Sequence, residues 1–179
     1  MTNIEKRNTV LASIKEVLCE KNKRYGNSAL EPLGVFYKGS ATDSIRIRLD
    51  DKLSRIKNSP ILRKNDMYDL LGYLFLLNIS LTGFKEFTFE ENVDCIIGNI
   101  NNIGCPKLVS APEDCIDNIF DKENKHTDTL ESLNFLYYCI KKGSGDASTE
   151  ELSIILCFIA YIVQYFIENN ITDFTDLID

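Results

Sequence analysis

Apolar residues in this chain recur mostly every three or four positions, which is the spacing of an α-helix that buries one face. The pattern predicts a first helix over residues 3–23 and a second over residues 42–58, capped by one of residues 42–44. The buried stripe of the second helix would consist of Ile45, Leu49, Leu53 and Ile56. Residues 66–81 are apolar on almost every side, so we expect a central helix that begins near Asp66.

The second half of the chain also predicts helices. Thr88 and Glu91 have the spacing of a capping box, so a helix is expected to begin there and to end at about Ile100. Shorter helices are expected over residues 110–120 and 130–142. Residues 149–168 are strongly apolar, but the apolar run is shorter than the roughly 20 residues of a membrane span and has acidic flanks, so we interpret it as a core helix.

Together these elements indicate an all-α protein, a bundle of about seven helices with a long loop between the first two. Only the short run at residues 34–38 could be extended. A chain of 179 residues with 44% apolar residues is long and apolar enough for one packed domain. We divide it into a basic half, residues 1–85, and an acidic half, residues 86–179, that are expected to pack together.

The two halves differ strongly in charge. Residues 1–85 contain 15 Lys and Arg against 9 Asp and Glu, a net charge of +6, whereas residues 86–179 contain 5 against 18, a net charge of −13. The basic half suggests an anion site, and the acidic half suggests either solubility or the docking of a basic partner. The sequence pI of about 4.8 disfavours binding of extended nucleic acid by the whole protein.

The six cysteines include no C-x-x-C pair, and the single histidine, His126, lies in a polar stretch. We therefore expect neither a zinc site nor a Cys–His catalytic pair. Cysteines in apolar runs are interpreted as buried thiols of a protein in a reducing cytoplasm. No apolar leader and no membrane partner are expected, although the helix over residues 149–168 could also bury one face in a homodimer.

Basic and aromatic residues alternate in the loop after the first helix. This mixture suits a nucleotide, because cations hold phosphates and an aromatic ring stacks on a base, but an ordinary loop with tucked rings is the alternative. The candidates in and beside this loop are Lys21, Arg24, Tyr25 and Tyr37. On the second helix, Arg48, Lys52 and Arg55 share one face and could hold phosphates, unless they form a solvated basic surface.

Carboxylates accompany these cations. Asp51 lies within one turn of Arg48 and could pair with it. Asp69 shares a helix face with Asp66 and Tyr73. The three carboxylates could orient the cations or bind ribose hydroxyls, whereas a helix cap at Asp66 and a structural ion pair at Asp69 are the alternatives.

Three motifs follow one another through this region: K-N-x-x-Y-G from residue 21, R-L-x-D-K-x-x-R from residue 48 and D-x-x-D-L-x-G-Y from residue 66. In this order they resemble the nucleotide modification associated domain family, first type. The matching positions are Lys21, Asn22, Tyr25, Gly26, Arg48, Leu49, Asp51, Lys52, Arg55, Asp66, Asp69, Leu70, Gly72 and Tyr73. The resemblance covers residues 10–83 and implies a phage-type protein associated with nucleotide metabolism.

The layout is also distantly similar to the all-α, MazG-like nucleoside triphosphate pyrophosphatases. Those proteins hold magnesium with E-x-x-E and E-x-x-D motifs. This chain has D-x-x-D at Asp66 and Asp69 but a wider Glu16-x-x-x-Glu20 spacing in place of E-x-x-E.

Three functions are compatible with these patterns. The first is a protein that captures a nucleotide or a nucleotide-derived signal without cofactor, for example against a host defence. The second is a magnesium-dependent nucleotide phosphohydrolase with Asp51, Asp66 and Asp69 as metal ligands, assisted by Glu16 and Glu20. The third is a protein-interaction module or DNA mimic that uses the acidic half. Cations outnumber carboxylates in the basic half, which favours capture.

Overall fold

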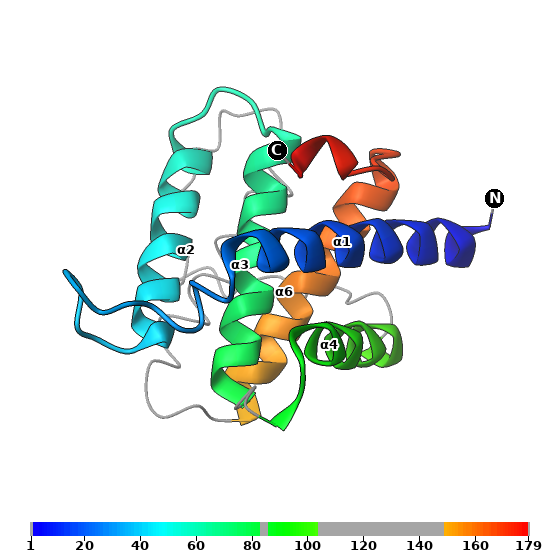
Figure 1. The fold of residues 1–179 in the computed structure, drawn as a ribbon. Coiled ribbons are helices and arrows are strands. Elements are labelled where there is room, and N and C mark those ends of the chain that lie inside the picture. The colour runs from blue at the N-terminus through cyan, green and yellow to red at the C-terminus, as the bar shows by residue number, and fades with distance from the viewer. Residues whose placement is uncertain (1, 83–85, 104–148, 179) are drawn as a thin grey trace.

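The computed structural model describes residues 2–82, 86–103 and 149–178 (Figure 1). Over these ranges the backbone forms five α-helices and one 3-10 helix, with no strand, which confirms the all-α prediction. The elements are α1 (Asn3–Tyr25), α2 (Ala41–Lys57), α3 (Lys64–Thr82), α4 (Phe89–Ile103), α6 (Thr149–Glu168) and η3 (Thr175–Leu177). The helices expected over residues 110–120 and 130–142, and His126, lie outside the described residues.

Helix α1 has clear signals at both ends. The backbone N–H of Glu5 donates to Thr2 Oγ1 at 3.2 Å, and the backbone N–H of Thr2 donates to Glu5 Oε2 at 2.6 Å, which makes a capping box. At the other end Gly26 and Asn27 both have φ of 58°, the left-handed conformation that glycine and asparagine tolerate best. This pair turns the chain sharply away from the helix axis.

Helices α2 and α3 form an antiparallel pair (Figure 1). The predicted stripe of four apolar residues on α2 is buried throughout, as the helical spacing required. The N-cap is Ser40, whose Oγ accepts from the backbone N–H of Asp43, so residues 42–44 lie in the first turn rather than at the cap. Helix α3 begins at Lys64, two residues before the expected start, and Asp66 therefore lies inside the helix.

Helix α3 is the centre of the fold. It packs against α2 on one side and against α6 and α4 on the other, while α1 crosses in front of α3 and α6 (Figure 1). Seven of its apolar side chains have no measurable exposure: Met67, Leu70, Leu71, Leu74, Phe75, Leu77 and Ile79. This burial confirms the central helix that its all-round apolar pattern predicted.

Helix α6 begins and ends where the sequence predicted. Residues 151–168 have a mean hydropathy of 1.7, so this helix is long and apolar enough to cross a membrane by length and composition, and half of this window is buried inside the fold. It packs against α1, α3 and α4. Glu151 at its start is fully buried and accepts a hydrogen bond of 2.7 Å from the Arg46 guanidinium, which links α6 to α2.

The C-terminal segment closes the other end of the bundle. Phe174 is fully buried between the rings of Tyr68 and Phe166, with centroid separations of 5.3 and 4.7 Å. Lys64 holds Asp176 at 2.6 Å. These contacts fix η3 beside the C-terminal half of α1 and the start of α3.

Candidate functional site

A pocket of about 420 Å³ lies where the C-terminal end of α1 meets α3, beside Lys52 of α2 and the first residue of α4. We call it the lysine pocket. Two lysines and one carboxylate line it together with three tyrosines, three small residues, an asparagine and three apolar side chains. These are Lys21, Lys52, Asp69, Tyr25, Tyr68, Tyr73, Ser28, Ala29, Gly72, Asn22, Leu18, Leu76 and Phe89. Its volume is in the lower part of the range of roughly 300–1,000 Å³ typical of small-molecule sites.

Each lysine of the pocket lies over a tyrosine ring of α3. Lys21 Nζ is 5.3 Å from the centroid of Tyr68, and Lys52 Nζ is 5.9 Å from the centroid of Tyr73. Because a cation is attracted to the face of an aromatic ring, these contacts orient both ammonium groups. Two flexible side chains are thus held in a shared hollow before any ligand arrives.

The two lysines differ in their ionic partners. Lys52 Nζ donates to Asp69 Oδ2 at 2.7 Å, and only 15% of the Lys52 side chain is exposed. Lys21 has no carboxylate within ion-pair distance among the described residues. The structural ion pair considered for Asp69 is therefore present, and it leaves one positive charge of the pocket uncompensated.

The tyrosines contribute in different ways. Tyr68 is buried, its hydroxyl donates to the carbonyl of Ile14 at 3.5 Å, and burial raises the pKa of its phenol, so it stays a neutral group. Tyr25, the last residue of α1, is 63% exposed at the edge of the pocket. Of the two predicted stacking residues, Tyr25 lines the pocket and Tyr37 does not.

The turn after α1 forms one wall. The Asn22 side-chain amide donates to Asn27 Oδ1 at 2.7 Å, and the Gly26 N–H donates to the Asn22 carbonyl at 2.8 Å. The left-handed pair at residues 26 and 27 brings Ser28 and Ala29 back against α3. The asparagine and glycine of the first motif thus shape the site by fixing this turn, Asn22 with its side chain and its carbonyl and Gly26 with its backbone.

Gly72 keeps the α3 wall open. A Cβ atom built there would meet only Leu18 Cδ2, at 3.5 Å, which is an ordinary van der Waals contact. Packing therefore does not require glycine at this position. The backbone does not require it either, because Gly72 has an ordinary helical φ that any residue can adopt. The visible effect of Gly72 is free space in the pocket.

Two of the predicted ligand residues lie away from the pocket lining. Arg24 is held by Glu20 at 3.1 Å and donates to the carbonyl of Ile178 at 2.9 Å, so it ties α1 to the C-terminal segment. Tyr37 belongs to residues 31–40, a segment whose side chains are all exposed and in which Phe36 is 99% exposed.

Arg48 and Arg55, the two arginines of the basic face of α2, do not line the lysine pocket either. Arg48 is 62% exposed and lies 3.7 Å from Asp51, the pairing that the sequence suggested. Arg55 lies 3.4 Å from the buried carboxylate of Asp66. Arg63, which lies just before the start of α3, approaches Asp66 at 3.1 Å. Of the three cations on this face, the structure brings only Lys52 into the lysine pocket.

The three carboxylates proposed as metal ligands lie in three separate ion pairs, with Arg48, with Lys52, and with Arg55 and Arg63. Within the described ranges no three His, Cys, Asp or Glu side chains gather as a metal site would require. Glu16 and Glu20 lie at a different hollow.

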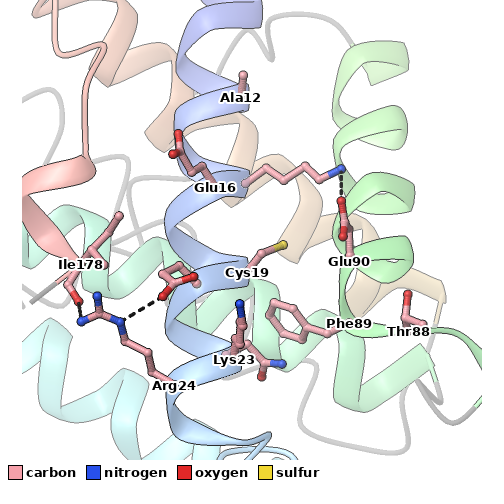
Figure 2. Close-up of a pocket in the computed structure, with 12 residues that line it drawn as sticks. Ala12, Glu16, Cys19, Lys23, Arg24, Thr88, Phe89, Glu90 and Ile178 are labelled. Atoms are coloured by element: carbon pink, nitrogen blue, oxygen red, sulfur yellow. Dashed lines mark hydrogen bonds and ion pairs between the residues drawn. The ribbon is translucent and has the colours of Figure 1, made fainter.

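That second hollow, about 810 Å³ and wider open, faces α4 (Figure 2). We call it the outer hollow. Its lining has as many cations, Lys15, Lys23 and Arg24, as carboxylates, Glu16, Glu20 and Glu90. Lys15 bridges to Glu90 at 2.9 Å and Asp94 at 2.7 Å, and hydrogen bonds to these carboxylates raise the pKa of its ammonium group. Burial raises the pKa of the Cys19 thiol at the centre of Figure 2, which keeps it protonated and poorly nucleophilic.

Several pocket residues were not among the predicted ligand contacts. Asn22 and Gly72 had a signal, since both belong to the resembling motifs. Tyr68 could have been found from its place beside Asp69 on an apolar helix. Phe89 had no signal in the sequence, because it belongs to α4, outside the three motifs, and only the packing of the helices brings it to the site.

Seven positions of the three motifs line this one pocket: Lys21, Asn22, Tyr25, Lys52, Asp69, Gly72 and Tyr73. Motifs separated by up to 45 positions along the chain are thus joined in space. No family model, curated protein or solved structure matches the chain.

Proposed function

We propose that this protein binds a nucleotide, or a small molecule derived from one, in the lysine pocket. The observation that carries the proposal is the pair of ammonium groups, Lys21 and Lys52, that share a small hollow with only one carboxylate. An uncompensated cation in a partly enclosed site favours an anion, and a phosphate accepts charge-assisted hydrogen bonds from lysine. This arrangement supports an anion site at the point where the sequence motifs converge.

The remaining groups suit the uncharged part of a nucleotide. Tyr25 offers an exposed ring at the edge of the pocket, where a base can stack. Asp69 uses Oδ2 for Lys52, and its other oxygen is available to accept from a ribose hydroxyl or a base N–H. Leu18, Leu76 and Phe89 supply the apolar surface that excludes water from the contact.

Capture without turnover is the form of this function that the geometry supports best. Hydrolysis assisted by magnesium would need carboxylates that converge on the phosphate, whereas the three candidate carboxylates lie in separate ion pairs. Sequestration of a nucleotide-derived signal, for example against a host defence, would need binding alone.

The test is calorimetric titration of the full chain with the monophosphates and triphosphates of the four common ribonucleosides, in magnesium and in chelator. Native mass spectrometry of protein purified from its own host would identify a ligand that is carried through purification. Binding is expected to persist in chelator, with no product formed in magnesium. Turnover that requires magnesium and is lost in Asp69→Ala would replace capture by hydrolysis.

A matched pair of variants ties binding to the pocket. Lys21→Gln removes the uncompensated cation and is expected to weaken binding about tenfold or more, since a charge-assisted hydrogen bond contributes roughly 1.5–3 kcal/mol. Lys23→Gln changes an exposed lysine two positions away on the same helix, at the outer hollow, and should leave affinity unchanged. Equal losses in both variants, or no binding of any nucleotide, would overturn the proposal.

A further inference from the structure

We infer that the lysine pocket is built for a ligand with a single phosphate group, a nucleoside monophosphate or a nucleotide phosphodiester, rather than for a polyphosphate. This inference rests on the proposed function and names the ligand class for it. It departs from the α2 pattern, in which Arg48, Lys52 and Arg55 together suggested a site for several phosphates.

The charge of the pocket is the first argument. Two lysines and one aspartate give the lining a net charge of +1. A phosphate monoester carries about −1.5 to −2 charges at pH 7 and a diester carries one, so a single phosphate comes close to neutralising the site. Each further phosphate adds negative charge for which the lining offers no additional cation.

The engagement of the arginines is the second argument. Arg55 faces the buried carboxylate of Asp66, and moving it onto a ligand would leave that carboxylate with Arg63 alone. Arg48 is exposed and pairs with Asp51 at the surface. Arg24, the remaining candidate, is tied to Glu20 and to the Ile178 carbonyl. A phosphate chain leaving the pocket would therefore meet arginines that already have partners.

The surroundings of the pocket are the third argument. Phe89 and Asn22 line both the lysine pocket and the outer hollow, so the outer hollow borders the site. The outer hollow contains Glu16, Glu20 and Glu90 and has no net charge from its lining. A phosphate chain gains little by entering it, and the volume of about 420 Å³ matches a small ligand confined to the lysine pocket.

The test compares ligands that differ only in their phosphates. For the base that binds best, the full chain is titrated with the nucleoside, its 5′-monophosphate, diphosphate and triphosphate, and its 3′,5′-cyclic monophosphate, at a fixed salt concentration. The nucleoside should bind at least about tenfold more weakly than the better of the two single-phosphate ligands, because it lacks the charge-assisted contacts. The second and third phosphates should change affinity by less than about threefold.

Two variants locate the phosphate. Lys21→Gln should reduce the affinity of every phosphate-bearing ligand and bring it toward that of the nucleoside. Arg48→Ala should leave all affinities unchanged, and Arg48→Lys serves as its control for charge. The cyclic and 5′-monophosphate arms show which kind of single phosphate the pocket prefers, and preference for either supports the inference.

The outcomes separate this inference from the function on which it rests. A triphosphate that binds tenfold more tightly than the monophosphate, and loses that advantage in Arg48→Ala, would overturn the single-phosphate inference while nucleotide binding stands. A series in which no ligand binds, or in which Lys21→Gln has no effect on any of them, would overturn both.

Discussion

The two hollows on the C-terminal half of α1 contain similar residue types but differ in how their charges are matched. In the outer hollow three cations accompany three carboxylates, and Lys15 is held between Glu90 and Asp94. In the lysine pocket two cations face one carboxylate, and Lys21 has only the ring of Tyr68 beside it within the described part of the chain. The smaller hollow is therefore the better anion site, although the larger one has more basic residues.

The difference shows why a count of basic residues is a weak guide to an anion site. Most of the cations in residues 1–85 that contact another described residue contact a carboxylate, and these pairs connect helices or stabilise the surface of one helix. What distinguishes a binding site is a cation that the fold positions and does not neutralise. Three substitutions test this distinction, from the largest expected effect to the smallest.

Lys52→Met should have the largest effect, because it acts on binding and on stability. Loss of the ammonium group should weaken nucleotide affinity about tenfold or more. The substitution also leaves Asp69 without its partner, and this loss should lower the free energy of unfolding by about 1 kcal/mol. Calorimetric titration and urea denaturation measure the two effects separately. In the double variant with Asp69→Asn, stability should recover while affinity stays low; recovery of affinity as well would mean that Lys52 serves only the ion pair.

Gly72→Ala should raise the stability of the protein while it weakens nucleotide binding. Alanine is favoured over glycine inside a helix, so the free energy of unfolding should rise by roughly 0.5–1 kcal/mol. The new methyl group contacts Leu18 at an ordinary distance but occupies the pocket, so affinity should fall roughly threefold or more. Thermal unfolding and titration of the same sample give both numbers. Affinity equal to that of the unchanged protein would place the ligand away from the α3 wall.

Lys15→Met in the outer hollow should have the smallest effect. Its partners Glu90 and Asp94 are more than half exposed, so a small decrease in melting temperature is expected, and high salt should reduce the difference. Because the folded state raises the pKa of Lys15 above 10.5, its contribution is fully present below that pH and is lost as the pH rises further. Nucleotide affinity should not change; a loss of binding here would make the outer hollow part of the site.

Periodicity predicted the helices well because burial is a property of a helix face. The stripe on α2 and the all-round apolar α3 were both confirmed, and the bounds of α6 agreed with the prediction. The cap of α2 was missed by at least two residues, since Ser40, Thr42, Asp43 and Ser44 are all competent caps and sequence alone does not rank them. Helix ends depend on local hydrogen bonds that periodicity does not register.

The candidate site was only partly predictable for a related reason. Spacing places Arg48, Lys52 and Arg55 on one face of α2, but it does not say which of them lies level with the end of α1. Lys52 does, whereas each arginine is about one turn away along the axis, at Asp51 or at Asp66. Spacing does not separate Tyr25 from Tyr37 either: Tyr25 ends α1 at the edge of the pocket, whereas Tyr37 lies in the exposed segment 31–40.

The tyrosines of the lysine pocket have an optical consequence. The chain contains eight tyrosines and no tryptophan, so its intrinsic ultraviolet fluorescence is tyrosine emission, with no indole signal over it. Three of those eight, Tyr25, Tyr68 and Tyr73, line the pocket. A base that stacks on Tyr25 would quench part of that emission, so the unlabelled protein reports on occupancy of its own site.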